Sequence, residues 1–350
     1  MADSDGTAVG TEQTNAAGSF DNLEVGKYKI TATLSDGTTE KKKVEKTINI
    51  KNLDDMSAYL FVHFVDTQED ATREQIYFSV SKDGKTWTTL NNKQPYLTSN
   101  VGTQGVRDPY ILRGEDGKFF IIATDLSVYN LKNNWTAAAQ QGSKSIVVWE
   151  SSDLVNWSEA SLVKINNDNA GCTWAPEACY DPEKDEYMVF WASVVSDDSY
   201  QKYRIYRSYT KDFKTFSAPE LYIEEPNAVI DTTIIDHEGT YYRFTKNEAK
   251  SSITMQECTS LSGDWKDVAN YNLGSMTGYE GPTIYKLNGK NEWCLLLDYF
   301  SKSKGYKPFV TTDITKGEFT ADSDFSFDGT YRHGTVMPIT QAEYESLTAE

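Results

Sequence analysis

Five residues that could do acid–base chemistry stand in short segments that recur along the chain. Each segment begins with a charged or proline-containing group and continues as a short apolar strand; the residues are Asp108, Glu177, Asp231, Glu280 and His333. If the fold brings them together, the carboxylates repel one another's charge, and some of them must have a raised pKa. One carboxylate that activates water and another that donates a proton are what hydrolysis of a glycosidic bond requires.

Each of these residues also has a purely structural interpretation. Asp108–Pro109 could form an ordinary turn, Glu280–Pro282 a loop, and His333 a hydrogen-bonded core histidine. The common phase of the five segments favours a shared site over five unrelated local features. The other two histidines, His63 and His237, fall outside this phase, and we interpret them as structural or surface residues.

A second pattern alternates with these segments and shows how the chain is organised. It is a turn that follows a strand and contains a small polar residue, usually an aspartate, and then an aromatic residue. Its five copies are Ser81–Trp87, Ser151–Trp157, Thr210–Phe216, Thr259–Trp265 and Thr312–Phe319. Repeats with periods of this length are typical of propellers and arrays.

Four repeat units are continuous and the fifth is split between the two ends of the repeat region. The continuous units are 108–170, 174–226, 230–275 and 280–329. The fifth has its inner strand at Thr335–Ile339 and its other strands between Tyr59 and Trp87. The sequence therefore predicts an all-β fold, a five-bladed β-propeller closed by pairing N-terminal strands with the C-terminal strand, which leaves no long exposed sheet edge. The alternative is an all-β sandwich with accidental repeats.

The segments before the propeller differ in composition from it. Residues 1–19 are small and polar and are predicted to be a flexible tail. Residues 20–57 alternate polar and apolar positions around a turn at Ser35–Thr38, which predicts a β-hairpin. A single hairpin cannot enclose a core, so we interpret it as the remnant of an Ig-like accessory module. Residues 58–350 form the predicted catalytic domain.

Composition limits the partners of the chain. With 34 Lys and Arg against 52 Asp and Glu, the net charge is −18, which argues against binding to nucleic acid. No apolar run approaches the roughly 18 residues of a membrane span, so no membrane partner is predicted. Neutral sugars are compatible with this charge. The aromatic content of 13% suits strands and the stacking of sugar rings.

The four cysteines do not identify a cellular compartment. Their spacing matches no zinc-binding pattern. We interpret them as free thiols, although a bridge between Cys172 and Cys179 stays open; the cysteines are Cys172, Cys179, Cys258 and Cys294.

Taken together and in order, five segments resemble glycoside hydrolase family 43. They are Arg107–Ile111, Trp174–Glu177, Ile230–Asp231, Glu280–Tyr285 and Arg332–Gly334, and the resemblance extends over about residues 58–340. That family consists of five-bladed propellers that cleave α-L-arabinofuranosides and β-D-xylosides with inversion. The resemblance implies that Asp108 is the general base, that Glu280 is the general acid, and that Asp231 orients the acid and raises its pKa.

The resemblance also bears on the residues around these three. It implies that His333 is the channel histidine, which supports an axial water or a bound cation such as calcium, while the chemistry itself needs no cofactor. Trp174 is predicted to stack on a sugar, and Asp125 and Arg332 to contact its hydroxyls. Glu177 stands where many members have aspartate, so only the shape of a substrate subsite depends on it.

The function implied by the resemblance is that of an exo-acting α-L-arabinofuranosidase on plant cell-wall polysaccharides or oligosaccharides. Gly105–Pro109 and Arg332–Val336 look like the arabinofuranosidase-containing branches of the family. A β-xylosidase or an exo-galactanase of the same fold, or a non-catalytic carbohydrate-binding propeller, stays open. The invertase-like five-bladed families need an Asn-Asp-Pro segment near the N-terminus, and the sequence has none.

The partners and location follow from this hypothesis. The expected partner is a carbohydrate that contains arabinose or xylose. We expect a monomer, or part of a multidomain enzyme, and an extracellular or periplasmic location as a secreted bacterial enzyme.

Overall fold

The computed structural model describes residues 26–35, 40–50, 55–65 and 70–349 of the chain. Clustering of its contacts divides the chain into two units, Met1–Met56 and Ser57–Glu350. In the first unit, β1 (Gly26–Ser35) pairs antiparallel with β2 (Glu40–Ile50), so a hairpin is present where the alternating pattern predicts one. The predicted tail at 1–19 and most of the turn lie outside the described residues, and the origin of the hairpin in an Ig-like module stays a prediction.

Four sheets of the second unit each consist of four consecutive antiparallel strands. The first blade contains β6 (Val106–Arg113), β7 (Phe119–Asp125), β8 (Ser145–Ser151) and β9 (Ser161–Lys164). The second contains β10 (Trp174–Asp181), β11 (Glu186–Ser193), β12 (Arg204–Thr210) and β13 (Glu220–Ile223). The third contains β14 (Val229–His237), β15 (Thr240–Asn247), β16 (Ser252–Cys258) and β17 (Lys266–Asp267). The fourth contains β18 (Glu280–Lys286), β19 (Trp293–Asp298), β20 (Tyr306–Thr311) and β21 (Thr320–Ala321).

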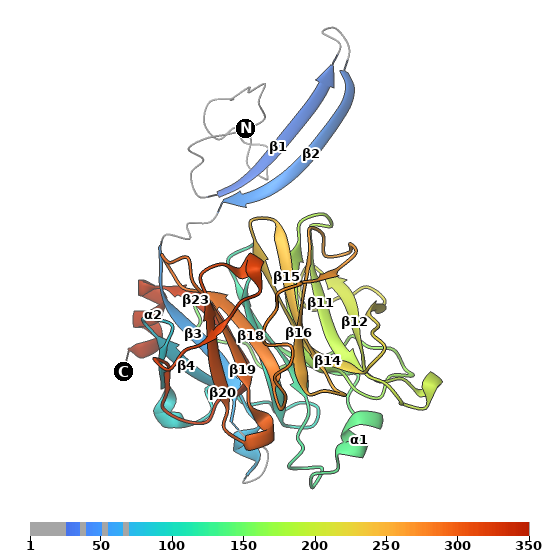
Figure 1. The fold of residues 1–350 in the computed structure, drawn as a ribbon, viewed down its shortest axis with the longest axis vertical. Helices are drawn as coiled ribbons and strands as arrows, with labels where there is room; N and C mark the ends of the chain where they lie inside the picture. The colour runs from blue at the N-terminus through green and yellow to red at the C-terminus, as the bar shows by residue number, and fades with distance from the viewer. Residues whose placement is uncertain (1–25, 36–39, 51–54, 66–69, 350) are drawn as a thin grey trace. The chain divides into compact units, whose positions relative to one another are not determined.

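The fifth sheet combines strands from both ends of the propeller. Its strand order is β22–β5–β4–β3–β23. The strands are β3 (Met56–Phe64), β4 (Tyr77–Ser81), β5 (Thr86–Thr89), β22 (Ser326–Phe327) and β23 (Arg332–Thr340). Figure 1 shows the red C-terminal strand β23 beside the blue strand β3. The predicted split is therefore confirmed, and β22, which pairs parallel with β5, is an additional outer strand that the repeats did not indicate.

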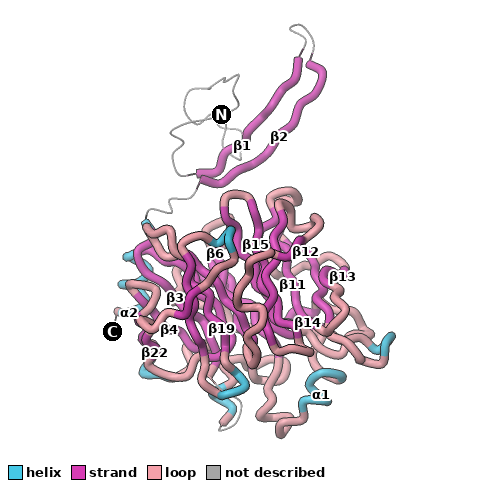
Figure 2. Tube along the Cα trace, in the orientation of Figure 1, coloured by secondary structure: helices cyan, strands magenta, loops and turns pink. Residues whose placement is uncertain are grey.

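The innermost strands of the five sheets form a closed ring. Each contacts the next in the order β6, β10, β14, β18, β23 and back to β6. The five-bladed propeller is therefore confirmed and the sandwich alternative is wrong. Strands dominate the structure (Figure 2), and the α-helices α1 (Trp135–Gln140) and α2 (Gln341–Thr348) are short. In α2, Glu343 accepts hydrogen bonds from Arg113 of β6 at 2.7 and 2.8 Å, which attaches the C-terminal helix to the first blade.

The recurring aspartates have a structural role in the turns. Asp153 Oδ1 accepts hydrogen bonds from the backbone N–H groups of Val155 and Asn156 at 3.0 and 2.7 Å. Asp212 makes the same pair of bonds in the second blade. Such bonds mimic a backbone turn, which explains why aspartate recurs there. They also lower the pKa of Asp153 to about 2, because hydrogen bonds from Asn156 favour the carboxylate.

The structure settles the expectation for the cysteines. All four cysteines are free, so the Cys172–Cys179 bridge is not formed. In the part of the chain that the structure describes, no helix is long and apolar enough to cross a membrane.

His63 is a buried core histidine, in agreement with its interpretation as structural. Its Nδ1 lies 3.0 Å from the carbonyl oxygen of Phe64, and its Nε2 lies 2.9 Å from Ser79 Oγ. Its ring stacks on Tyr331 with a centroid distance of 4.0 Å. Burial lowers the pKa of His63 to about 4, so the folded protein holds this imidazole neutral at neutral pH.

This burial predicts a pH-dependent contribution of His63 to stability. In the unfolded chain its pKa returns to about 6.5, so below that pH the unfolded state binds a proton that the folded state does not. The free energy of unfolding should therefore fall as the pH drops from about 6.5 towards 4. Replacing His63 with glutamine removes this pH-dependent contribution. The difference in the free energy of unfolding between wild type and variant should therefore shrink by about 3 kcal/mol between about pH 7 and pH 4. Denaturant titrations measure it; a constant difference would contradict a neutral, buried His63.

Candidate active site

Four innermost strands contain the same irregularity near their N-terminal ends. Each of β6, β10, β14 and β18 has one extra residue relative to its neighbouring strand. At this bulge the backbone φ is positive, at 49° for Asp108, 47° for Ala175, 49° for Asp231 and 51° for Gly281. Glycine and aspartate tolerate this conformation better than most residues. Bulges bend a strand and redirect the side chains around them, and they are frequent beside active sites.

The bulges correct one expectation from the sequence. The five predicted residues do not occupy one equivalent strand position: Asp108 and Asp231 are bulge residues, Glu280 precedes the bulge residue of β18, and Glu177 follows that of β10 by two positions. In a regular strand, consecutive side chains point to opposite faces. An inserted residue interrupts this alternation, so residues at different positions of the motif can reach the same space.

A single imidazole lies between two of the predicted acids. His333 Nδ1, from the fifth blade, is 3.4 Å from Asp108 Oδ1 of the first blade and 3.9 Å from Asp231 Oδ1 of the third. The other oxygen of Asp108 accepts a hydrogen bond of 2.9 Å from Thr124 Oγ1. Three blades thus contribute charged side chains to one place on the ring axis.

The fourth blade adds Glu280 to this group. Asp231 Oδ2 accepts a hydrogen bond of 3.0 Å from the backbone N–H of Gly281, the residue after Glu280. Glu280 itself accepts from Lys246 Nζ at 2.9 Å and from Arg332 Nη2 at 3.3 Å. The three predicted acids therefore all lie on innermost strands and are linked through neighbouring groups.

The accessibility of the three acids differs in a way that bears on their roles. The side chain of Glu280 is 21% exposed and that of Asp108 is 14% exposed, whereas that of Asp231 is 8% exposed. A group that exchanges a proton with substrate or water must be reachable. Glu280 and Asp108 meet this requirement better than Asp231, which is less exposed.

The environment gives these carboxyl groups different proton affinities. Burial alone would raise the pKa of Asp108, but the hydrogen bond and positive charge of His333, with the charge of Arg107, bring that pKa below its usual value. Burial raises the pKa of Asp231 above its usual value, and the charge of Glu280 adds to this effect against the opposing charge of His333. Neighbouring carboxyl groups with separated pKa values are typical of sites that do acid–base catalysis.

His333 holds a positive charge at neutral pH. Burial opposes that charge, but Asp231, Asp108 and Glu177 together raise the pKa of His333 to about 9. Among the described residues, no group of three His, Cys, Asp or Glu side chains is arranged to hold a metal ion. The cation predicted beside His333 therefore has no direct ligand set there, and a water-mediated site stays a prediction.

The predicted substrate-binding residues lie in different environments. Trp174 is partly exposed and packs on Tyr203 and Trp135, with ring centroids 5.3 and 6.2 Å away. Glu177 is buried, which raises its pKa to about 8, and its Oε2 has no hydrogen-bond partner. Trp174 can therefore be reached by a sugar, whereas contact between Glu177 and substrate stays a prediction.

The other two, Asp125 and Arg332, already have protein partners. Asp125 is buried, and its Oδ1 accepts from the backbone N–H and the hydroxyl of Thr103 at 2.7 and 2.9 Å. It lines a cavity of about 350 Å³ together with Trp174, apart from the three acids. Arg332 donates to Asp298 at 2.6 Å and to Glu280 at 3.3 Å. Arg332 therefore belongs to the surroundings of Glu280.

Sequence reasoning missed three residues of the site. Lys246, Asp298 and Thr124 lie near the C-terminal ends of the second strands of their blades, and strand pairing places them opposite the motifs: Ile230 opposite Lys246, Glu280 opposite Asp298, and Arg107 opposite Thr124. In each of these blades the first and second strands are joined by a turn and pair antiparallel. Matching residues outwards from that turn would have predicted the partner of each motif residue to within one position.

Comparisons with known proteins show the family of this chain. Residues 54–345 match the model of a family-43-related group described as a probable glycosyl hydrolase domain. An α-L-arabinofuranosidase of Bifidobacterium longum subsp. longum is 30% identical over an alignment of 345 positions that covers 84% of this chain and 32% of that protein. The chain thus spans about a third of the length of this curated relative.

Solved structures are similar at a lower level. The catalytic domain of a family 62 α-L-arabinofuranosidase from Coprinopsis cinerea is 16% identical with a TM-score of 0.47, over 65% of this chain and 71% of that one. An exo-β-1,3-galactanase from Phanerochaete chrysosporium is 17% identical with a TM-score of 0.47, over 65% of this chain and 53% of that one.

Proposed function

Because this chain belongs to the glycosyl hydrolases related to family 43, we propose that its propeller removes terminal α-L-arabinofuranosyl groups by a single displacement with inversion. The observation that carries the proposal is that Asp108 and Asp231 flank His333, while Asp231 also bonds the backbone N–H of Gly281, the residue next to Glu280. An inverting glycosidase needs two carboxyl groups with opposite tasks, one that accepts a proton from water and one that donates a proton to the leaving oxygen.

In the proposed mechanism Asp108 is the general base. Its lowered pKa keeps it ionised at neutral pH, so it can accept a proton from a water molecule. The hydrogen bond from Thr124 and the contact with His333 fix its two oxygens. The water attacks the anomeric carbon on the face opposite the leaving group, through a transition state that resembles an oxocarbenium ion.

Glu280 is the proposed general acid. It protonates the glycosidic oxygen while the bond to the anomeric carbon breaks, so the leaving group departs as a neutral alcohol. Lys246 and Arg332 hold its carboxyl group at 2.9 and 3.3 Å. Asp231 is a positioning residue: its bond to the N–H of Gly281 fixes the backbone next to Glu280, and its charge affects the proton affinity of its neighbours.

The choice of sugar is supported by the relative from Bifidobacterium longum, which is an α-L-arabinofuranosidase. A β-xylosidase or an exo-galactanase would use the same acid and base and differ in the contacts to the sugar hydroxyls. A non-catalytic sugar-binding propeller would show no turnover of any glycoside.

A panel of aryl glycosides tests the proposal directly. We expect hydrolysis of the aryl α-L-arabinofuranoside, with the aryl β-D-xyloside and β-D-galactoside cleaved more slowly. When the reaction is followed by ¹H NMR, the first sugar product should have the β configuration before mutarotation, because water attacks opposite the leaving group. A first product with retained configuration would contradict Asp108 as a water-activating base, and a faster xyloside or galactoside would replace the substrate assignment.

A further inference from the structure

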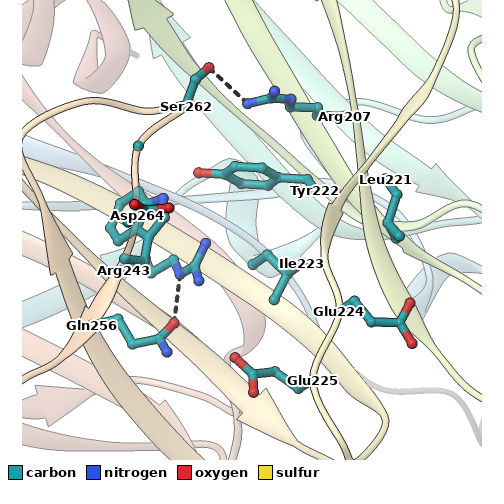
Figure 3. Close-up of a pocket in the computed structure, with 12 residues that line it drawn as sticks. Arg207, Leu221, Tyr222, Ile223, Glu224, Glu225, Arg243, Gln256, Ser262 and Asp264 are labelled. Atoms are coloured by element: carbon teal, nitrogen blue, oxygen red, sulfur yellow. Dashed lines mark hydrogen bonds between the residues drawn. The ribbon is translucent and has the colours of Figure 1, made fainter.

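A cavity between the second and third blades is separate from the axial site. Its volume is about 310 Å³, at the lower end of the range for small-molecule pockets. Its lining comes from β12, β13, β15 and β16 and from the loop after β16, and none of it belongs to an innermost strand. We call it the lateral cavity; its polar and aromatic lining residues include Arg207, Tyr222, Arg243, Gln256 and Trp265. Figure 3 shows most of them around one space.

Several buried polar atoms of this lining have no hydrogen-bond partner. They are Arg207 Nε, Tyr222 Oη, Arg243 Nη1 and Trp265 Nε1. Arg243 is 95% buried, since only 5% of its surface is exposed, and its Nε donates to Gln256 at 2.8 Å (Figure 3). The Tyr222 hydroxyl interacts with the Arg243 side chain and raises the pKa of Arg243, but neither Tyr222 Oη nor Arg243 Nη1 has a hydrogen-bond partner of ordinary geometry. Unsatisfied buried donors destabilise a fold, which favours a ligand that accepts hydrogen bonds.

The lining also forms a stack of alternating aromatic and cationic groups. The guanidinium carbon of Arg243 lies 4.3 Å from the ring centroid of Trp265 and 5.6 Å from that of Tyr222. The guanidinium carbon of Arg207 lies 5.0 Å from the ring centroid of Tyr222, on the other side of that ring. Stacking occupies the faces of the guanidinium groups and stabilises the blade interface. It leaves their in-plane N–H groups to other partners, so the stack alone does not account for these donors.

The charges around the cavity indicate what kind of acceptor fits. Arg207 makes a long ion pair of 3.5 Å with Glu220, and Arg243 has no ion pair with any described residue. Burial lowers the pKa of Arg243, and Tyr222 and the charge of Glu225 offset this effect only in part, so a further negative partner would stabilise its charge. However, Glu224, Glu225 and Asp264 also line the cavity and would repel a doubly charged anion. A single carboxylate on a ring with hydroxyl groups fits both conditions, because the hydroxyls can donate to these acids.

We propose that the lateral cavity is a second carbohydrate site, which binds a uronic acid through its carboxylate. The carboxylate pairs with Arg243 Nη1 and accepts from Trp265 Nε1, and the sugar hydroxyls meet Tyr222 and the acids of the lining. The choice of a sugar acid rests on the proposed function, since a glycosidase that acts on plant polysaccharides meets uronate units in its substrates. The site would hold an acidic part of a polymer while the axial site cleaves a neutral side branch.

Binding of D-galacturonate to the full chain tests this proposal. In a protein with ¹⁵N-labelled tryptophan, the Nε1–H signal of Trp265, identified with the variant Trp265→Phe, should shift as galacturonate is added. The methyl ester of galacturonate, which has the same ring without the charge, and inorganic phosphate should bind at least about tenfold more weakly, since a hydrogen bond to a charged group differs by that factor. Equal binding of the ester or of phosphate, or no shift with galacturonate, would overturn the proposal.

Two variants locate the binding and separate it from catalysis. Arg243→Gln should weaken galacturonate binding by about tenfold or more. Trp265→Phe keeps an aromatic ring at this position but removes the Nε1–H donor. It therefore remains informative if the arginine variant does not fold. The control is Lys214→Gln, which removes the same charge at a side chain that is 70% exposed and does not line the cavity, and it should bind as the wild type does. All three variants should hydrolyse an aryl arabinofuranoside at the wild-type rate, so failure of the binding test and failure of the proposed function are distinguishable.

Discussion

Replacing Glu280 with glutamine should lower kcat for an arabinofuranosyl disaccharide by about 10³-fold, the middle of the range for general acid catalysis. The amide has no proton to donate to the leaving oxygen, and an alkoxide is a poor leaving group. Glutamine keeps the size of the side chain and an oxygen that can still accept from Lys246 and Arg332. The loss should therefore appear in kcat without loss of the fold, as thermal unfolding of the variant can verify.

The same variant should lose less activity on 4-nitrophenyl α-L-arabinofuranoside. The 4-nitrophenolate ion is stable enough to leave without a proton, so the acid contributes less to its departure. Equal losses on the two substrates would show that Glu280 positions the substrate rather than protonating it.

Glu248→Gln is the matched control for this experiment. Its carboxylate contacts the same Lys246 at 3.2 Å but does not contact Asp108 or Asp231 in any ion pair or hydrogen bond of the described residues. This variant replaces a carboxyl group that contacts Lys246 with an amide, as Glu280→Gln does. It should keep most of the activity on both substrates, so a large loss would indicate that the charge around Lys246, and not the proton of Glu280, limits the rate.

The propeller could be predicted because its units are local. Each blade folds from consecutive strands, so its strands and its turns leave the same pattern in the sequence at each repeat, as in Ser151–Trp157 and Thr210–Phe216. Ring closure could be predicted from the split unit, since Thr335–Ile339 has no partner strands after it and Tyr59–Val65 has no inner strand before it. The strand β22 was missed because two residues are too short to show a period.

The candidate site could be predicted only in part. The motifs gave Asp108, Asp231 and Glu280, but the bulges that place them depend on backbone conformation, and a positive φ at Asp108 has no pattern of its own in a single sequence. Lys246 lies on the second strand of the third blade. Its antiparallel pairing with Ile230 places it in the site, and this pairing is not visible in the motifs of the innermost strands.

The lateral cavity had no sequence signal at all. Arg207 and Arg243 belong to different blades, and their stacking around Tyr222 depends on how two sheets pack side by side. Contacts between blades have no fixed spacing in the chain, so neither the repeats nor the composition pointed to them. The location of the protein and its oligomeric state stay predictions.

Replacing Asp108 should have an effect as large as that of Glu280 but of a different kind. Asp108→Asn should lower kcat by about 10³-fold on both the disaccharide and the nitrophenyl substrate, because activation of water is needed whatever the leaving group. The comparison of the two substrates therefore separates the base from the acid. Asparagine also tolerates the φ of 49° at this position, so the bulge should persist. A loss confined to the disaccharide would contradict the assignment of Asp108 as the base.

The glycine variant at this position gives the most specific test of the base. Glycine adopts a φ of 49° without strain, so Asp108→Gly should keep the bulge while it opens space where the carboxylate stood. Azide ion is already a nucleophile and needs no base, so it should restore turnover of the nitrophenyl substrate by attacking the anomeric carbon from the water side as the phenolate leaves. The product should be the β-L-arabinofuranosyl azide, with inverted configuration, as NMR can establish. In the wild type the water route should persist and no glycosyl azide should form. If azide restores no activity, or yields the α-azide, then Asp108 does not face the anomeric carbon opposite the leaving group, and the inverting mechanism proposed for this propeller is wrong.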